Sequence, residues 1–147
     1  MEIRFTKMHG IGNDYIYVNC LNKELDDFGA VSAAMSPRHF SVGADGLVAI
    51  CRSEIADAKM RMFNLDGSEG MMCGNGIRCF AKFCYDHHLT DKKVLNIETK
   101  AGLRIVELIF DGDEVVGAKV DMQEPILNCK DIPVIFDQEK MINEKVM

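Results

Sequence analysis

Short stretches in which hydrophobic and polar residues alternate make up most of the chain. In residues 58–63, Met60 and Met62 fall on one face and basic side chains on the other, as in a half-buried β-strand. Similar stretches bounded by turn residues predict further strands over 3–8, 15–19, 47–51, 94–99, 103–110 and 114–122. Turns at 101–102 and 111–113 separate the last three, which are therefore predicted to form an antiparallel meander.

The segment Ile77–Tyr85 has a different pattern, because seven of its nine residues are apolar. The exceptions, Arg78 and Lys82, are four residues apart and share one narrow stripe of a helix. A helix that is apolar on nearly every side has to be buried on nearly every side, and a sheet wrapped around it is the simplest way to do so. The pattern predicts an α+β fold: a barrel-like mixed or antiparallel sheet rolled around one central apolar helix.

A second, shorter helix is predicted over Asp26–Met35, capped by one of the two aspartates at its start and ended by Pro37. The last stretch, Glu124–Met147, contains Pro125 and Pro133 and little periodicity. It is predicted to leave the domain and to add nothing to its core.

Two glycine-bracketed loops, His9–Asp14 and Ser41–Gly46, are predicted where strands begin. Asn13 in the first loop has two interpretations. It is either ordinary turn chemistry or an amide presented to a ligand, and the pattern leaves both open.

Charge and cysteine usage narrow the function classes. The net charge of −6, without a basic cluster, argues against nucleic acid as a partner. No apolar run approaches the roughly eighteen residues of a membrane helix, and the first residues lack the pattern of a signal peptide, so no membrane and a cytoplasmic location are expected. The six cysteines contain no C-x-x-C pair, so no metal site is expected. Without an export signal a reducing compartment is expected, and therefore no disulfides.

Cys73 is the sharpest candidate for chemistry, because it stands where a glycine-rich loop is predicted to become the central helix. A helix N-terminus favours the thiolate over the free thiol, whose pKa is about 8.5. The backbone amides of residues 74–76 are placed to hold a carboxylate. A thiolate beside a carboxylate cradle is what removal of an α-proton from an amino acid requires.

The alternative is a structural Cys73, since most free cysteines are small buried residues. The glycine loops would then be turns and the chain a non-catalytic binding domain. Cys79 and Cys84, inside the apolar helix, are predicted to belong to the core, as are Cys20 and Cys51 at strand ends.

Four motifs are similar to those of a known family. They are KMHGIGNDY (7–15), GADG (43–46), FNLDGSE (63–69) and CGNGIRC (73–79). In this order and spacing they closely resemble the N-terminal half of the diaminopimelate epimerase family, over residues 1 to about 125.

The resemblance implies a cofactor-independent epimerase that interconverts LL- and meso-2,6-diaminopimelate with two cysteines, one on each face of the α-carbon. Cys73 matches the first cysteine. Asn13 and Asn64 match amides that contact the substrate, and Gly74 and Asn75 match the amides that receive its α-carboxylate. No cofactor and no metal are implied, and a homodimer is possible in such a family.

Two departures from the family pattern are visible. Ser41–Gly43 replaces the more usual Gly-Ile-Gly, and the family's second half, with its own cysteine, does not occur before Met147. Residues 1–125 are therefore expected to be the N-terminal domain, and 126–147 an exit segment towards a second domain. One thiol cannot return a proton to the opposite face, so this chain alone is predicted not to epimerise at a normal rate. Proline racemases and phenazine-pathway isomerases, related enzymes of the same fold, are the alternative.

Overall fold

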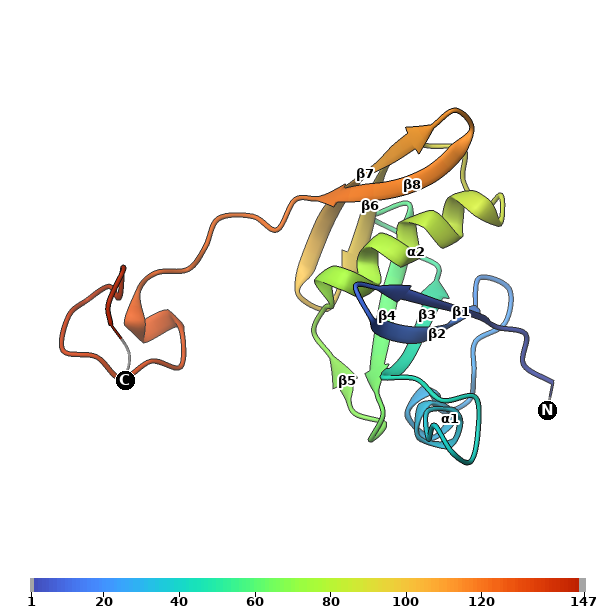
Figure 1. Ribbon diagram of the computed structural model, residues 1–147, viewed down its shortest axis with the longest axis horizontal. Coiled ribbons are helices and arrows are strands. Elements are labelled where there is room, and N and C mark those ends of the chain that lie inside the picture. Colours follow the sequence, from blue (N-terminus) through green and yellow to red (C-terminus); the bar gives the residue numbers. More distant parts are fainter. Residues whose placement is uncertain (1, 146–147) are drawn as a thin grey trace.

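The computed structural model describes residues 2–145, and eight strands of this part form one mixed sheet that curls around helix α2 (Gly74–Asp86) (Figure 1). In sheet order the strands are β1 (Thr6–Gly10), β2 (Asn13–Asn19), β3 (Gly46–Cys51), β4 (Ala58–Asn64), β6 (Val94–Thr99), β7 (Gly102–Asp111) and β8 (Glu114–Val120), with β5 (Glu69–Gly70) paired to β4. The predicted fold, a rolled sheet with a central helix, is confirmed.

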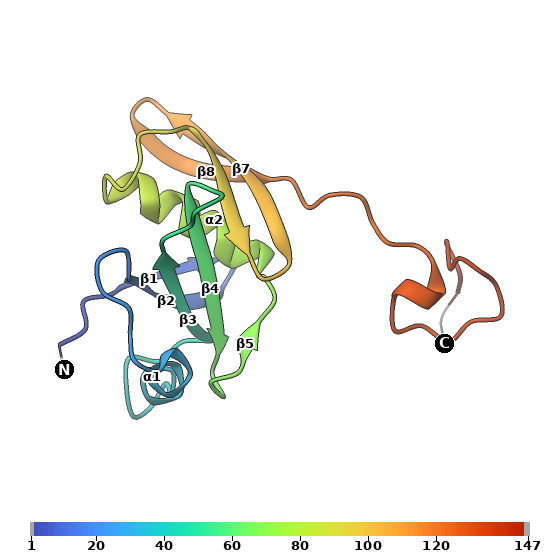
Figure 2. The ribbon, with the colours of Figure 1, turned by 180° about the vertical axis from the view of Figure 1, so that it is seen from behind.

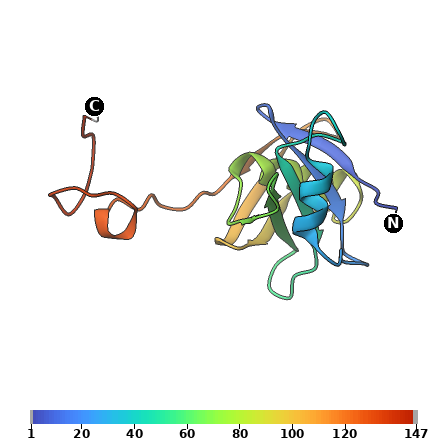
Figure 3. The ribbon, with the colours of Figure 1, turned by 90° about the horizontal axis from the view of Figure 1, so that it is seen from below.

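Helices α1 and α2 lie on opposite faces of this sheet, and each belongs to a crossover between parallel strands. The pairs β2–β3 and β4–β6 are parallel, and a parallel pair needs a long connection. Helix α1 (Phe28–Met35) lies in the first connection and α2 in the second. Seen from behind, β3 and β4 pass in front of α2 (Figure 2), and the view from below shows α1 on the outside of the sheet (Figure 3).

Alternation along the strands divides the core into two clusters. Tyr17 and Ile50 face inward and pack with Phe80 of α2, whereas Ile16 and Leu47 face outward and belong to the cluster of α1. Every residue of β3 is buried, because both of its faces are covered.

Helix α2 is buried as its apolar pattern predicts. Seven of its thirteen residues are buried, and Arg78 and Lys82 are only partly so. The Lys82 ammonium donates to the Val115 carbonyl of β8 at 2.9 Å, and the sheet leaves β1 and β8 unpaired with each other. The polar stripe of the helix therefore lies at the opening of the rolled sheet.

The first hairpin differs from its prediction. The first strand is Thr6–Gly10 and not 3–8, and the predicted loop over residues 9–14 shrinks to the turn Ile11-Gly12. Both turn residues have positive φ, 56° and 81°, as in the two-residue turns that match the twist of a hairpin. The loop prediction was wrong because strand pairing continues through Gly10 and Asn13.

Other boundaries shift less. The shorter helix begins at Phe28, with Asp27 as its cap, and the last predicted strand ends at Val120. The short strand β5 was not predicted. No helix within residues 2–145 combines the length and hydropathy of a membrane span.

After β8 the chain runs away from the sheet (Figure 1). It contains a short 3-10 helix, η1 (Cys129–Asp131), and an isolated bridge between Asn128 and Lys140. The division into residues 1–125 and 126–147 stays a prediction.

Candidate active site

Cys73 is the N-cap of α2, at the helix start where the sequence puts it. Its backbone is extended, its Sγ accepts a hydrogen bond from the Gly76 amide at 3.3 Å, and its carbonyl accepts the first helical bond from the Ile77 amide at 2.9 Å. Cys73 is half-buried, whereas the other five cysteines are buried. It is therefore the most accessible thiol of the chain.

The first amides of the helix are available beside this thiol. Within residues 2–145, no hydrogen-bond partner is found for the amides of Gly74 and Asn75, as the first turn of a helix leads one to expect. The Gly76 amide, predicted as a third carboxylate donor, binds the thiol instead. Two amides and the positive end of the helix dipole thus face the space next to Sγ.

The first hairpin brings Asn13 to the thiol from sixty residues away. The Asn13 amide Nδ2 donates to Cys73 Sγ at 3.4 Å. Gly10 makes this approach possible, because a Cβ there would lie 2.9 Å from the Asn75 carbonyl oxygen. The tip of the hairpin therefore rests directly on the first turn of α2.

Two tyrosines of β2 also reach this turn. The Tyr17 hydroxyl donates to the Gly76 carbonyl at 3.0 Å and ties the helix start to the sheet. Burial, and then the neighbouring Cys73 thiol, raise the pKa of Tyr15 to about 12. No motif predicts a role for Tyr15 by itself, although its position two residues after Asn13 on a strand places both on one face.

An ion-pair cluster fixes the start of β2. Arg38 binds Asp14 through both terminal nitrogens, at 2.6 and 3.1 Å, and also binds Asp45 at 2.9 Å. The Arg38 guanidinium and the Lys7 ammonium hold the pKa of Asp14 well below its usual range, against the opposing effect of burial. The Asp14 amide donates to the Asp45 carboxylate at 3.1 Å, and the Asp45 amide donates to the Asp14 carbonyl at 2.8 Å. These bonds complete the cluster, which holds the neighbouring Asn13 in place.

Asn64 ends β4, at the same end of the central strands as Asn13, but it is not hydrogen-bonded to the thiol. It pairs in register with Gly46, which pairs with Tyr15, so roughly two strand spacings, about 10 Å, separate Asn64 from Tyr15. Its amide donates to the Ser68 hydroxyl at 3.0 Å, and the residue is exposed. The structure therefore brings Asn13, Gly74 and Asn75 to Cys73 and leaves Asn64 farther along the edge.

The remaining thiols of α2 lack this environment. Burial raises the pKa of Cys84 to about 12 and also raises the pKa of Cys79, so both stay protonated at neutral pH.

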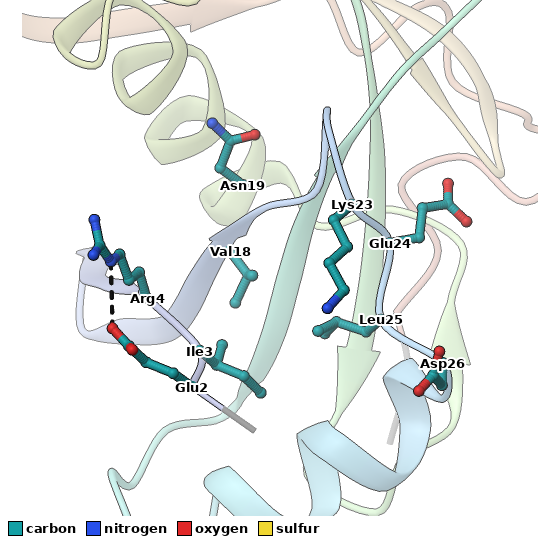
Figure 4. A pocket seen from close by; sticks show the side chains of 9 residues that line it. All are labelled: Glu2, Ile3, Arg4, Val18, Asn19, Lys23, Glu24, Leu25 and Asp26. Carbon is teal, nitrogen blue, oxygen red and sulfur yellow. Dashed lines mark hydrogen bonds and ion pairs between the residues drawn. The ribbon is translucent and has the colours of Figure 1, made fainter.

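A cavity of about 190 Å³ near the N-terminus lies away from this region (Figure 4). Its charged side chains have both signs and come from the residues Glu2, Arg4, Lys23, Glu24 and Asp26. Cys73 does not line it, and its mixed charges select for no particular ligand. The half-buried thiol and its two N–H donors lie elsewhere, at the start of α2.

Solved structures with the same fold define the structural class. The chain is similar to methylitaconate-delta-isomerase, with a TM-score of 0.64 and 16% identity over 78% of this chain and 36% of that one. It is also similar to a hydroxyproline epimerase from Agrobacterium vitis, with a TM-score of 0.60 and 12% identity over 80% of this chain and 40% of that one. At these identities the likeness shows the fold alone, which is the one used by these isomerases and epimerases.

Sequence comparison specifies the family. The model of the family described as diaminopimelate epimerase matches residues 5–127. A diaminopimelate epimerase of Methanococcus maripaludis is 51% identical over 98% of this chain, and one of Acetivibrio thermocellus is also 51% identical over 98%. This chain belongs to the diaminopimelate epimerase family, as its motifs predicted. It spans about half the length of these relatives, 52% and 51%.

Proposed function

We propose that this chain supplies one half of the active site of an epimerase that interconverts LL- and meso-2,6-diaminopimelate without a cofactor, for lysine and peptidoglycan precursor synthesis. The observation that carries the proposal is the convergence at Cys73 Sγ of the Asn13 amide and the Gly76 amide, beside the open amides of Gly74 and Asn75.

Each group has a role in this scheme. The Cys73 thiolate takes the α-proton, and the electron pair of the C–H bond stays on the substrate, delocalised toward its carboxylate. The amides of Gly74 and Asn75 hold that carboxylate and stabilise the growing negative charge. Asn13 orients the thiolate, and Asn64, farther along the edge, contacts a more distant part of the substrate.

The opposite face of the α-carbon needs a second thiol, which we assign to a segment outside these 147 residues. Residues 1–125 are then the first domain, and 126–147 lead to the second. The greater length of the family relatives supports this division. A cytoplasmic location and assembly into a homodimer are further parts of the proposal.

The test is incubation of the 147-residue chain with LL-diaminopimelate in D₂O, followed by NMR for α-hydrogen exchange and chiral chromatography for the meso isomer. A single thiol removes and returns a proton on one face, so slow exchange with retention and almost no meso product are expected. Cys73→Ala should abolish the exchange. Cys129→Ala, which removes a buried thiol from the exit segment, should leave it unchanged.

Two results would contradict the proposal. Meso product formed at the rate of a full-length relative would contradict the claim that this chain supplies only half of the active site. Exchange that survives in Cys73→Ala would contradict the role of this cysteine. One alternative, a proline racemase-like enzyme of the same fold, predicts exchange with L-proline and none with diaminopimelate. A binding domain with a structural Cys73 predicts no exchange with either.

A further inference from the structure

Strand β2 presents three polar side chains in a row to the start of α2. Successive residues of a strand alternate between faces, so Asn13, Tyr15 and Tyr17 share the inner face. The first of them donates to Cys73 Sγ, and the third donates to the carbonyl of Gly76. Tyr15 lies between these two contacts, and nothing in the scheme above uses its hydroxyl.

The ring of Tyr15 is buried against a glycine of the neighbouring strand. Tyr15 pairs in register with Gly46 of β3 and is only 5% exposed. A Cβ at Gly46 would lie 3.1 Å from Tyr15 Cε1 and would collide with the carbonyl of Phe63. The missing side chain at Gly46 therefore makes room for the tyrosine ring, and close packing leaves the ring few alternative rotamers.

We propose that Tyr15 is a positioning residue of this site: its hydroxyl, in the cluster against which Cys73 packs, donates a hydrogen bond to Sγ when the thiol ionises and joins the Asn13 and Gly76 N–H groups in stabilising the thiolate. The role of Tyr15 rests on the proposed function in one respect only, that the thiolate takes the α-proton of the substrate. Burial and the nearby thiol raise the pKa of Tyr15 to about 12, so its hydroxyl remains a donor throughout the range in which thiols titrate.

The other titratable groups near the sulfur carry no charge at neutral pH. Burial raises the pKa of Tyr17 and that of Cys79, which lie on β2 and α2. Met60 of β4 packs near the Cys73 side chain at Gly76, and Met122, after β8, lies over Gly74.

Charged side chains are farther from the thiol. Asp45 lies near Tyr15, and its carboxylate is bound to Arg38 at 2.9 Å. Arg78, on α2, binds the side chain of Asn75. Within residues 2–145, no charged side chain is hydrogen-bonded to Cys73 Sγ.

The experiment is alkylation of the 147-residue chain by iodoacetamide from pH 5 to 10, with Cys73→Ala to identify the reaction of this thiol. Tyr15→Phe removes one hydroxyl and keeps the ring. Loss of one hydrogen bond to a charged group should move the midpoint of the rate profile up by about one pH unit, which is about a tenfold slower reaction below the midpoint. The plateau rate at high pH should stay within about twofold, because the sulfur is no less accessible.

Tyr85→Phe is the matched control. Tyr85 lies near the other end of α2, with its ring edge against Phe110, and its variant should leave the profile unchanged. A profile for Tyr15→Phe that superimposes on that of the wild type overturns the proposal. An alkylation rate that falls by the same factor at every pH also overturns it, since that result indicates a packing role only.

A reciprocal measurement avoids Tyr15→Phe, in case that variant does not fold. Coupling between two groups is mutual, so removal of the thiol in Cys73→Ala should let one tyrosine ionise at lower pH, seen as tyrosinate absorbance after a rapid pH jump. Identical curves for wild type and Cys73→Ala overturn the proposal. Deuterium exchange into diaminopimelate separates the role of Tyr15 from the proposed function. A shifted alkylation profile without exchange supports the role of Tyr15 and contradicts the proposed function. Exchange without a shifted profile supports the proposed function and contradicts the role of Tyr15.

Discussion

Helices α1 and α2 begin in the same way, yet the proposed site lies at the start of only one of them, α2. Asp27 and Cys73 are both N-caps with extended backbones, and each side chain accepts a hydrogen bond from the amide three residues later. Asp27 Oδ1 accepts from the Ala30 amide at 2.9 Å, and Cys73 Sγ accepts from the Gly76 amide at 3.3 Å.

The chemistry of the two caps differs. Aspartate is among the most favourable N-cap residues, and cysteine is not, so Asp27 serves the stability of α1. Cys73 occupies a capping position with a weak hydrogen-bond acceptor, and a second element, the β1–β2 hairpin, brings Asn13 against it. Cap geometry therefore does not distinguish the two helix starts; the hydrogen bond that a side chain of another element donates to the capping atom does.

The largest effect is expected when α2 receives a better cap. Cys73→Ser keeps the capping geometry and replaces the thiol with a hydroxyl that does not ionise near neutral pH. Exchange of the substrate α-hydrogen should fall by about 10²–10⁴-fold, the usual worth of a general base. The free energy of unfolding in urea should stay equal or rise by about 0.5–1 kcal/mol, because serine is a preferred cap. A large loss of stability would instead assign Cys73 to the core.

The second prediction concerns the ion-pair cluster that holds the hairpin. Asp14→Asn removes the charge that Arg38 and Lys7 bind, and should lower the free energy of unfolding at pH 7 by about 1–2 kcal/mol, since solvent screens the half-exposed partners. The alkylation of Cys73 should also slow, because Asn13 adjoins the loosened residue.

The pH dependence follows from the lowered pKa of Asp14. This carboxylate contributes stability above its unfolded pKa of about 3.9, and the contribution is lost as the pH falls from about 5 toward the lower folded value. The urea midpoint should therefore fall less between pH 7 and pH 3 in Asp14→Asn than in the wild type. Asp113→Asn, in the exposed β7–β8 turn, is the control and should behave like the wild type.

The sequence predicted those parts of the site that depend on local pattern. The helix start at Cys73 and the free amides that follow it are properties of one segment, and the apolar sides of α2 predicted the sheet around it. The approach of Asn13 and Tyr15 depends on contacts about sixty residues apart in sequence. It also depends on room left by Gly10 and Gly46, whose neighbours only the folded chain reveals.

The mildest test removes the cap of α1, whose carboxylate accepts a hydrogen bond from its own helix and none from a second element among the described residues. Asp27→Ala deletes the hydrogen bond to the Ala30 amide and should lower the free energy of unfolding by about 0.5–1 kcal/mol, measured in urea. The pH profile of Cys73 alkylation should be unchanged, because α1 packs on the outer face of the sheet and α2 on the inner face. A shifted profile would mean that the two helix starts are coupled through β3 and β4. Cys73 would then depend on the whole sheet, and the hairpin contact would no longer account for the difference between the two caps.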